Sequence, residues 1–254
     1  MQMKILGIIP ARYASSRFPG KPLVMIDGKS MIQRVYEQAL KCKELSSLII
    51  ATDSDVIEKH IVAFGGNVVT TSVNHNSGTE RCNEVLEKLA IDQNDPYSVV
   101  INIQGDEPFI DPEQISEVAN AFSNPDIQIA TLMKRIKSDD ELNDPNVVKV
   151  IIDKSFKAIY FSRFPIPFFR GKNREEWLKE RAYFKHIGIY AYRSPSLRGI
   201  AKLPVSLLEK AESLEQLRWI ENGYPVHVLE TEFDSFAIDT PADLLKITNT
   251  TLLS

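Results

Sequence analysis

The feature that most constrains this fold is the alternation of short apolar runs with segments of helical periodicity along residues 4–122. The apolar runs are short and end at turn-forming residues, so we expect strands at residues 4–10, 47–52, 67–71 and 98–103. Apolar residues recur at helical spacing after Ser30, a predicted N-cap, and over residues 56–64, 79–89 and 112–122. Such alternation is typical of a parallel sheet with helices on both faces.

After Pro125 the alternation gives way to closely spaced strand patterns. We expect strands at residues 127–135, 147–152, 157–162 and 184–192, with no long helix between the first three, and therefore a region of mixed sheet. Residues 163–181 begin with closely spaced prolines and carry Trp177 and many charges, which predicts a loop or lid and not a packed element. A helix near residues 214–221, a strand at 226–230 and a helix at 241–248 complete the chain.

Composition excludes several classes of protein. A hydrophobic content of 43% in 254 residues is enough for a large core, and a net charge of -4 argues against a nucleic-acid-binding surface. Cys42 and Cys82 are too few for a disulfide framework and are spaced unlike a zinc site, so we expect two reduced, buried thiols. No signal peptide or membrane span is apparent, which predicts a cytoplasmic protein without membrane insertion.

The loop at residues 10–23, PARYASSRFPGKPL, concentrates cations directly after the first strand. Arg12, Arg17 and Lys21 would suit a triphosphate, because loops at the carboxyl ends of parallel strands bind ligands and arginine and lysine both bind phosphate oxygens. Charge alone favours a solvated surface loop, since basic loops are common. Gly28, Lys29 and Ser30 imitate the end of a P-loop, but Leu23 stands where that motif needs its first glycine.

Two further segments place carboxylates where they could face the basic loop. Asp106 follows an apolar strand in the run QGDEP, and a hard cation such as magnesium prefers carboxylate and phosphate oxygens. Asp239 precedes a Thr-Pro helix start in FAIDTPADL. Taken alone, Asp239 is better explained as a helix cap than as a metal ligand.

Together these runs resemble the CMP-Kdo synthetases, the cytidylyltransferases that activate 3-deoxy-manno-octulosonate (Kdo). The resemblance extends over essentially the whole chain. Besides the basic loop, QGDEP and IDTPADL, it includes ATDSD at residues 51–55, SGTER at 77–81, YFSR at 160–163, HIGIYAYR at 186–193 and ESLEQLRWIENG at 212–223.

The resemblance implies a single α/β domain spanning residues 1–254, with a Rossmann-like three-layer αβα nucleotidyltransferase fold around a predominantly parallel sheet. It implies that residues 125–190 form a mixed-sheet and lid region that contributes to sugar binding and to a homodimer. It also implies that CTP and Kdo react to give CMP-Kdo and pyrophosphate, for lipopolysaccharide biosynthesis.

The same resemblance assigns roles to individual residues. The nucleotide would be bound by Arg12, Ser15, Arg17, Lys21, Gly78, Arg81 and Asp106. Asp106 and Asp239 would coordinate Mg2+, and Lys21 and Arg17 would act with them in catalysis. The sugar would be bound by Gln104, Arg163, His186, Tyr190, Glu215 and Gln216.

Two alternatives stay open. A small change in the sugar pocket would redirect the chain to sialic acid or an amino-substituted Kdo. A non-catalytic nucleotide-binding protein could keep the same fold, because a fold alone does not establish an activity. Individual residues also have structural alternatives: Tyr190 could belong to the core, His186 could be a structural histidine, and Glu215 and Gln216 could lie on a solvated helix face.

Overall fold

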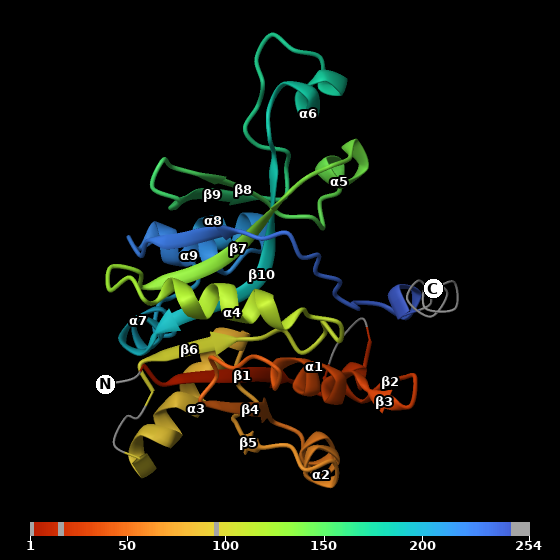
Figure 1. The fold of residues 1–254 in the computed structure, drawn as a ribbon, viewed down its shortest axis with the longest axis vertical. Coiled ribbons are helices and arrows are strands. Elements are labelled where there is room, and N and C mark those ends of the chain that lie inside the picture. Colours follow the sequence, from red (N-terminus) through yellow and green to blue (C-terminus); the bar gives the residue numbers. More distant parts are fainter. Residues whose placement is uncertain (1–2, 15–17, 94–96, 245–254) are drawn as a thin grey trace.

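The computed structural model describes residues 3–14, 18–93 and 97–244 (Figure 1). Its first half confirms the predicted alternation of strands and helices. The elements are β1 (Ile5–Ala11), α1 (Met31–Ala39), β4 (Ser47–Thr52), α2 (Asp55–Ala63), β5 (Val68–Thr70), α3 (Gly78–Gln93), β6 (Val99–Asn102) and α4 (Pro112–Ala121). Strand β1 pairs in parallel with β4 and β6, and β4 pairs in parallel with β5.

The second half adds antiparallel strands to the same sheet, which confirms the predicted mixed region. The elements are β7 (Ile129–Arg135), α5 (Asp139–Asn143), β8 (Lys149–Ile152), β9 (Ala158–Ser162), β10 (Phe184–Arg193), α7 (Ser194–Ile200), α8 (Leu207–Glu212), α9 (Gln216–Glu221) and β11 (Val226–Glu230). Strand β10 lies antiparallel between β6 and β7, and β11 is parallel to β7. The strand order is β11-β7-β10-β6-β1-β4-β5, with β8 and β9 branching from β10.

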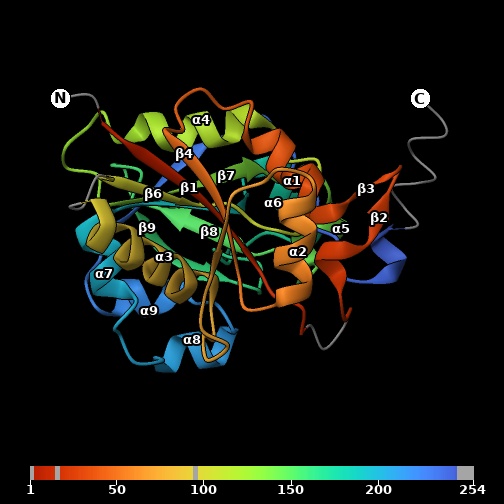
Figure 2. The same ribbon diagram turned by 90° about the horizontal axis from the view of Figure 1, so that it is seen from below.

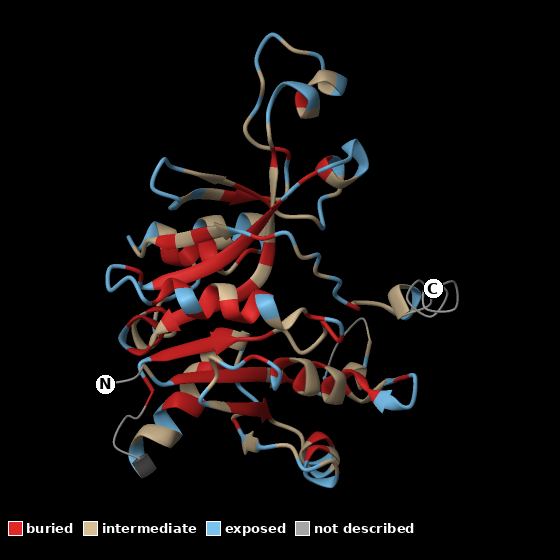
Figure 3. Cartoon of the chain, viewed as in Figure 1, coloured by how far each residue is buried: buried red, intermediate tan, exposed pale blue. Residues whose placement is uncertain are grey.

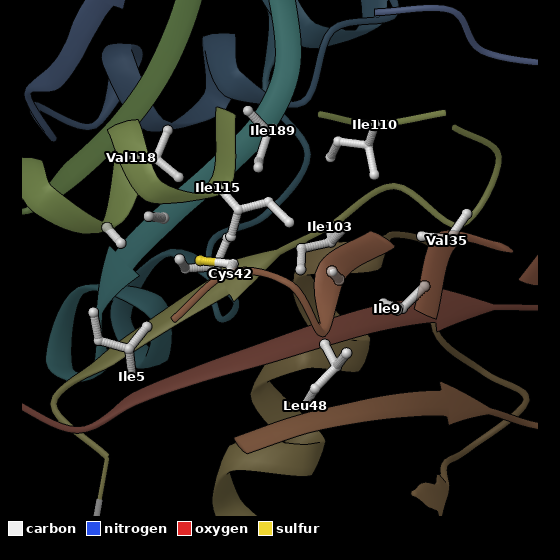
Figure 4. Packing of buried hydrophobic residues seen from close by; sticks show 14 of the residues in the cluster. Ile5, Ile9, Val35, Cys42, Leu48, Ile103, Ile110, Ile115, Val118 and Ile189 are labelled. Carbon is white, nitrogen blue, oxygen red and sulfur yellow. The ribbon is translucent and has the colours of Figure 1, made fainter. Parts of the chain in front are cut away.

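Two hydrophobic layers cover the two faces of this sheet, so the predicted three-layer α/β fold is confirmed (Figures 2 and 3). One layer holds the buried faces of α1, α2 and α4; in Figure 4, Ile9, Val35 and Ile115 lie within it. The other holds α3, α7 and α9. The alternation of side chains along each strand divides the apolar residues between the two layers.

Local side-chain caps explain where several helices begin. Ser30 accepts a hydrogen bond from the Gln33 N–H, which confirms the predicted N-cap of α1. Gly28 and Lys29 belong to a small hairpin and not to a P-loop: β2 (Met25–Ile26) and β3 (Lys29–Ser30) flank a turn in which Asp27 and Gly28 have positive φ. Cys42 and Cys82 are both free and buried, as expected.

The segment at residues 163–181 departs from the prediction. It projects from the body of the molecule as a mostly irregular arm, with a 3-10 turn η2 (Arg174–Glu176) and a short helix α6 (Trp177–Glu180) (Figure 1). The expectation that it is not packed was wrong, because Trp177 is buried with Ile136, Leu142 and Tyr183 in a small separate cluster. We call residues 163–181 the arm below.

Candidate active site

A cleft of about 310 Å³ lies beside the carboxyl ends of β1 and β6. Four segments line it: residues 10–12 and 21–22 after β1, residues 75–78 and 81 at the start of α3, residues 104–106 after β6, and Asp239. Parallel strands direct their carboxyl ends to the same edge, which is where ligands bind in open α/β sheets. The cleft therefore brings together the three sequence runs that were predicted to form the site.

Lys21 connects the two predicted metal ligands. Its ammonium group lies 2.7 Å from Asp106 Oδ2 and 3.2 Å from Asp239 Oδ1. It is placed by the short 3-10 turn η1 (Lys21–Leu23), which follows Gly20 in the left-handed conformation. A single cation between two carboxylates shows that this corner of the cleft can hold positive charge.

Asp239 is free of the capping role that its sequence position suggested. Residues 241–244 are helical, and it is Thr240 whose hydroxyl accepts from the Asp243 N–H, while Asp243 Oδ2 accepts from the Thr240 N–H at 3.0 Å. The Ile238 N–H donates to the Asp106 main-chain oxygen at 2.9 Å. This bond ties the two acidic segments together. The predicted helix beyond residue 244 lies outside the described residues.

Close backbone approach explains two glycines of the site. A Cβ added to Gly105 would lie 2.7 Å from the Pro10 carbonyl oxygen, too close for any side chain. A Cβ on Gly78 would lie 3.2 Å from Asn102 Nδ2. These contacts let the loops after β1 and β6 and the start of α3 meet around the cleft.

Of the other predicted nucleotide ligands, Arg12 lines the cleft, whereas Ser15 and Arg17 lie outside the described residues. Arg81 also lines the cleft but is almost fully buried and is held by Asp53, whose Oδ2 lies 2.7 Å from its guanidinium. It also donates to the Thr71 hydroxyl. Asp53, from the ATDSD motif, is thus a partner that the sequence did not assign.

His75 is a cleft residue that sequence reasoning treated as structural. Its Nε2 lies against the Glu84 carboxylate, which also accepts from the Ser72 N–H at 2.9 Å and pairs with Lys88 at 2.9 Å. Burial raises the pKa of Glu84, but the Lys88, Ser72 and His75 hydrogen bonds outweigh it and bring the pKa to about 2. The only sequence signal was the position of His75 two residues before SGTER.

The predicted sugar ligands divide into two groups, and the first lies along β10. Gln104 lines the cleft and donates from Nε2 to the Gly188 carbonyl at 2.9 Å. His186 shares a hydrogen bond of 2.9 Å with Thr131, and burial lowers its pKa to about 3, so the imidazole is neutral at pH 7. Tyr190 is buried, and its hydroxyl has no hydrogen-bond partner among the described residues.

The second group surrounds the turn between α8 and α9. Glu215 accepts from the Thr79 hydroxyl at 3.0 Å, and Gln216 is buried at the start of α9, so neither lies on a solvated helix face. Arg163 is held by main-chain carbonyls, with 2.7 Å from Nε to Glu212 O and 3.0 Å from Nη1 to Pro145 O. The part of the cleft lining that is described does not include Arg163.

The fold and the cleft are those of an α/β nucleotidyltransferase, and a family model described as cytidylyltransferase matches residues 6–231. The 3-deoxy-manno-octulosonate cytidylyltransferase of Parabacteroides distasonis is 53% identical over 248 residues, covering 96% of each chain. That of Cytophaga hutchinsonii is 50% identical and covers 98% of each chain. The solved structure of a CMP:2-keto-3-deoxy-manno-octonic acid synthetase complexed with CTP superposes with a TM-score of 0.89 at 40% identity, covering 98% of this chain and 99% of that one.

This chain therefore belongs to the cytidylyltransferase family, and within it to the 3-deoxy-manno-octulosonate cytidylyltransferases, as the motifs predicted. A 4-diphosphocytidyl-2C-methyl-D-erythritol synthase superposes with a TM-score of 0.62 at 17% identity, which is a similarity of fold alone. Among the described residues, no helix has the length and apolar character needed to cross a bilayer.

Proposed function

We propose that this protein transfers the cytidylyl group of CTP to Kdo, giving CMP-Kdo and pyrophosphate, and so supplies activated Kdo for lipopolysaccharide biosynthesis. The observation that carries the proposal is the arrangement of Lys21 between Asp106 and Asp239 on one wall of the cleft. Membership of a family whose members bear this activity in their names supports the choice of both substrates.

In the proposed reaction, the anomeric hydroxyl oxygen of Kdo attacks the α-phosphorus of CTP. A new oxygen–phosphorus bond forms, the bond from the α-phosphorus to the bridging oxygen breaks, and pyrophosphate leaves with the electron pair. The hydroxyl proton passes to solvent. Phosphoryl-type transfer needs mainly positioning and charge neutralisation from the protein, which suits a cleft with Arg12 and Lys21 on one side and two carboxylates on the other.

We propose that Mg2+ binds at Asp106 and Asp239. The donor set fits this ion, because magnesium is commonly held by one or two carboxylates together with substrate phosphates. The described residues contain no group of three or more His, Cys, Asp or Glu that would form a site of protein ligands alone. When bound, the ion would neutralise the charge of the phosphates and favour ionisation of the attacking hydroxyl.

The remaining predicted residues keep their proposed roles. Arg12, Ser15, Arg17, Lys21, Gly78 and Arg81 would surround the triphosphate and base, with Arg81 held in place by Asp53. Gln104, His186, Tyr190, Glu215 and Gln216 would contact the hydroxyls and carboxylate of Kdo, and the guanidinium of Arg163 would face the carboxylate. The unpartnered Tyr190 hydroxyl supports this, because a buried polar group needs a partner that a substrate could supply.

We also propose a homodimer and a cytoplasmic location, where CTP is available. The exposed apolar side chains of the predicted mixed-sheet and lid region support the homodimer, because Phe156, Ile159, Phe164 and Phe168 are all exposed there. The proposed arrangement has residues 125–190 contribute to both sugar binding and dimerisation within a single domain.

The test is pyrophosphate release by the full-length protein with CTP, Mg2+ and a panel of sugar acids: Kdo, an amino-substituted Kdo and sialic acid. We expect turnover with Kdo to exceed turnover with the other acids by about 100-fold, the discrimination that one matched polar contact can provide. Preference for another acid would reassign the sugar, and absence of turnover with every acid would favour a non-catalytic nucleotide-binding protein. Omission of Mg2+ should abolish release.

A further inference from the structure

The nucleotide half and the sugar half of the site are joined by one side-chain hydrogen bond between residues 136 positions apart in the sequence. The Thr79 hydroxyl donates to Glu215 Oε2 at 3.0 Å. Thr79 belongs to the first turn of α3, directly after the cleft residues Ser77 and Gly78, and Glu215 is the N-cap residue of α9. The bond therefore spans the two helix starts that face the proposed substrates.

We infer that Thr79 is a positioning residue, which orients the Glu215 carboxylate for the sugar acid through this hydrogen bond. The inference rests on the proposed function, in which Glu215 contacts Kdo. Thr79 itself is almost fully buried, so it acts through Glu215 and does not contact the sugar. Glu215 is partly exposed, as a residue that meets a substrate must be.

The surroundings of Glu215 show why its orientation depends on Thr79. The neighbouring Tyr190 and Tyr192 hydroxyls have no hydrogen-bond partner among the described residues, so neither fixes the carboxylate. Ser77 supplies one further hydrogen bond from the same end of α3. Arg218 acts on Glu215 only through its charge, since its guanidinium forms two bonds of 2.6 Å to Glu209. The start of α3 thus carries the hydrogen-bond donors that hold Glu215.

This geometry couples the nucleotide to the sugar. A nucleotide against Ser77 and Gly78 contacts the first turn of α3, and any adjustment of that turn moves Thr79 and with it the Glu215 carboxylate. Catalytic side chains need support from residues that lock their orientation, since small displacements reduce the rate. Thr79 is suited to this, because its β-branched side chain has few rotamers.

The first experiment is steady-state kinetics of Thr79→Val, which replaces the hydroxyl by a methyl group of similar volume. We expect kcat/KM for Kdo to fall about tenfold or more, the usual effect of losing a hydrogen bond to a charged group, while the KM for CTP stays within about twofold. Thr79→Ser keeps the hydroxyl and should restore most of the lost activity. Thr70→Val is the matched control, because it removes a Thr-to-Glu hydrogen bond of 2.9 Å to Glu58, away from the cleft.

A double-mutant cycle separates positioning from general destabilisation. In a Glu215→Ala background, adding Thr79→Val should cost little further kcat/KM for Kdo, because the carboxylate it orients is gone. Full additivity of the two substitutions would overturn the inference. So would wild-type kinetics of Thr79→Val, or an equal rise in the KM values for CTP and Kdo.

A readout that needs no turnover keeps this inference distinct from the proposed function. The side-chain carboxyl of Glu215 can be titrated by NMR in the wild type and in Thr79→Val. Burial raises the pKa of Glu215, and the Ser77 and Thr79 hydrogen bonds lower it. Loss of the Thr79 hydroxyl should therefore raise the pKa further. The other titratable groups that face Glu215, which are Arg218, Glu209, Cys82, Tyr190 and Tyr192, are unchanged in this variant.

An unchanged Glu215 pKa in Thr79→Val would overturn the hydrogen-bond assignment even if the wild type converts Kdo. Conversely, a raised pKa together with a wild type that releases no pyrophosphate with Kdo would leave the Thr79 contact standing and reject the proposed substrate.

Discussion

Single residues of the cleft carry opposite charges at short range, and Lys21 is at the centre of this arrangement. With no other cation in place, its ammonium group offsets the repulsion between Asp106 and Asp239. A metal ion in the same corner would take over that role and leave Lys21 available to a phosphate. The two carboxylates and the lysine thus form one charge unit whose members should not be interchangeable with neutral side chains.

Asp106→Asn tests this unit directly. The variant should fold and still bind CTP weakly, but it should release pyrophosphate with Kdo at least about 100-fold more slowly, because a neutral amide holds magnesium poorly and offsets less charge. CTP binding is measured by calorimetry and turnover by pyrophosphate release. The exposed Asp126 provides the control, and Asp126→Asn should match the wild type. Near-normal turnover of Asp106→Asn would remove Asp106 from the mechanism.

Glu84 gives a prediction on pH dependence. Its folded pKa of about 2 lies below the ordinary 4.5, so its contribution to stability is complete above pH 4.5 and is lost as the pH falls toward 2. Glu84→Gln should therefore lower the free energy of unfolding at pH 7 by about 1–2 kcal/mol, allowing for partial exposure to solvent. More than half of that difference should be gone by about pH 3.

Urea unfolding of both proteins between pH 7 and pH 3 measures the effect. Glu87→Gln is the matched control on the same helix, since Glu87 pairs with Arg198 at 2.7 Å but is half exposed, and it should cost less than about 1 kcal/mol. A Glu84→Gln difference that stays constant over this pH range would contradict the assigned ion pairs.

The residues that sequence analysis found and those it missed differ in what holds them. Lys21 and Asp106 could be predicted because each follows an apolar strand, and strand ends of a parallel sheet share one edge. Asp53 and Glu84 could not, because their importance comes from Arg81 and His75, which pack against them only in the folded chain. Ion pairs of this kind leave no periodic pattern in the sequence.

At the scale of elements, the sequence predicted those with strong periodicity or a clear cap. The bounds of β4 and β11 were predicted to the residue, and α4 begins after a capping box formed by Asp111 and Gln114. Helices α7 and α8 were missed. The first follows β10 without a loop, and the second has six residues and buries none of them, so it shows no amphipathic pattern.

The arm was predicted as a loop because of its prolines, yet it contains a packed core that depends on other segments. Trp177 stacks on Tyr183 at 5.8 Å between ring centroids and carries the Arg174 guanidinium 4.1 Å from its own ring. Leu142 and Ile136 complete the cluster. Because those partners come from α5, from the end of β7 and from the start of β10, local sequence could not reveal the burial of Trp177.

Trp177→Ala should loosen the arm without unfolding the sheet. The cluster around Trp177 is separate from the two main layers, so its loss should lower the local free energy of opening. We expect trypsin to cleave at Arg170 and Lys172 at least about tenfold faster, while the urea midpoint of the main transition changes little. Phe168→Ala is the control, because Phe168 touches Trp177 but is exposed. Equal cleavage rates in both variants would show that Trp177 does not anchor the arm.

At the scale of the whole molecule, the class of fold was predictable and the strand order was not. Alternating strands and helices specify a parallel sheet, but β10 enters antiparallel between β6 and β7, far from either in sequence. This insertion brings Tyr190 opposite Asn102 and sets the proposed sugar residues beside the nucleotide cleft. Long-range pairing of this kind is determined by packing of both sheet faces, which periodicity along one strand does not encode.

The proposed homodimer gives the prediction that belongs to the whole molecule. In β9, which pairs with β8 alone, Ile159 is 53% exposed, and the nearby Phe156 and Phe164 are also exposed. Strands at sheet edges with exposed apolar side chains favour association. We therefore expect light scattering to give the mass of two chains, and Ile159→Glu to weaken the dimer at least about tenfold by placing a charge in the interface.

Ile91→Glu is the matched control for this prediction, because Ile91 is 85% exposed on α3, outside the proposed interface. It should leave the mass unchanged. If Ile159→Glu also lowers kcat/KM for Kdo while Ile91→Glu does not, the dimer contributes to the sugar site, since residues 157–163 lead directly to Arg163. A wild type that scatters as a single chain at micromolar concentration would reject the homodimer, and an Ile159→Glu dimer as tight as the wild type would place its interface elsewhere.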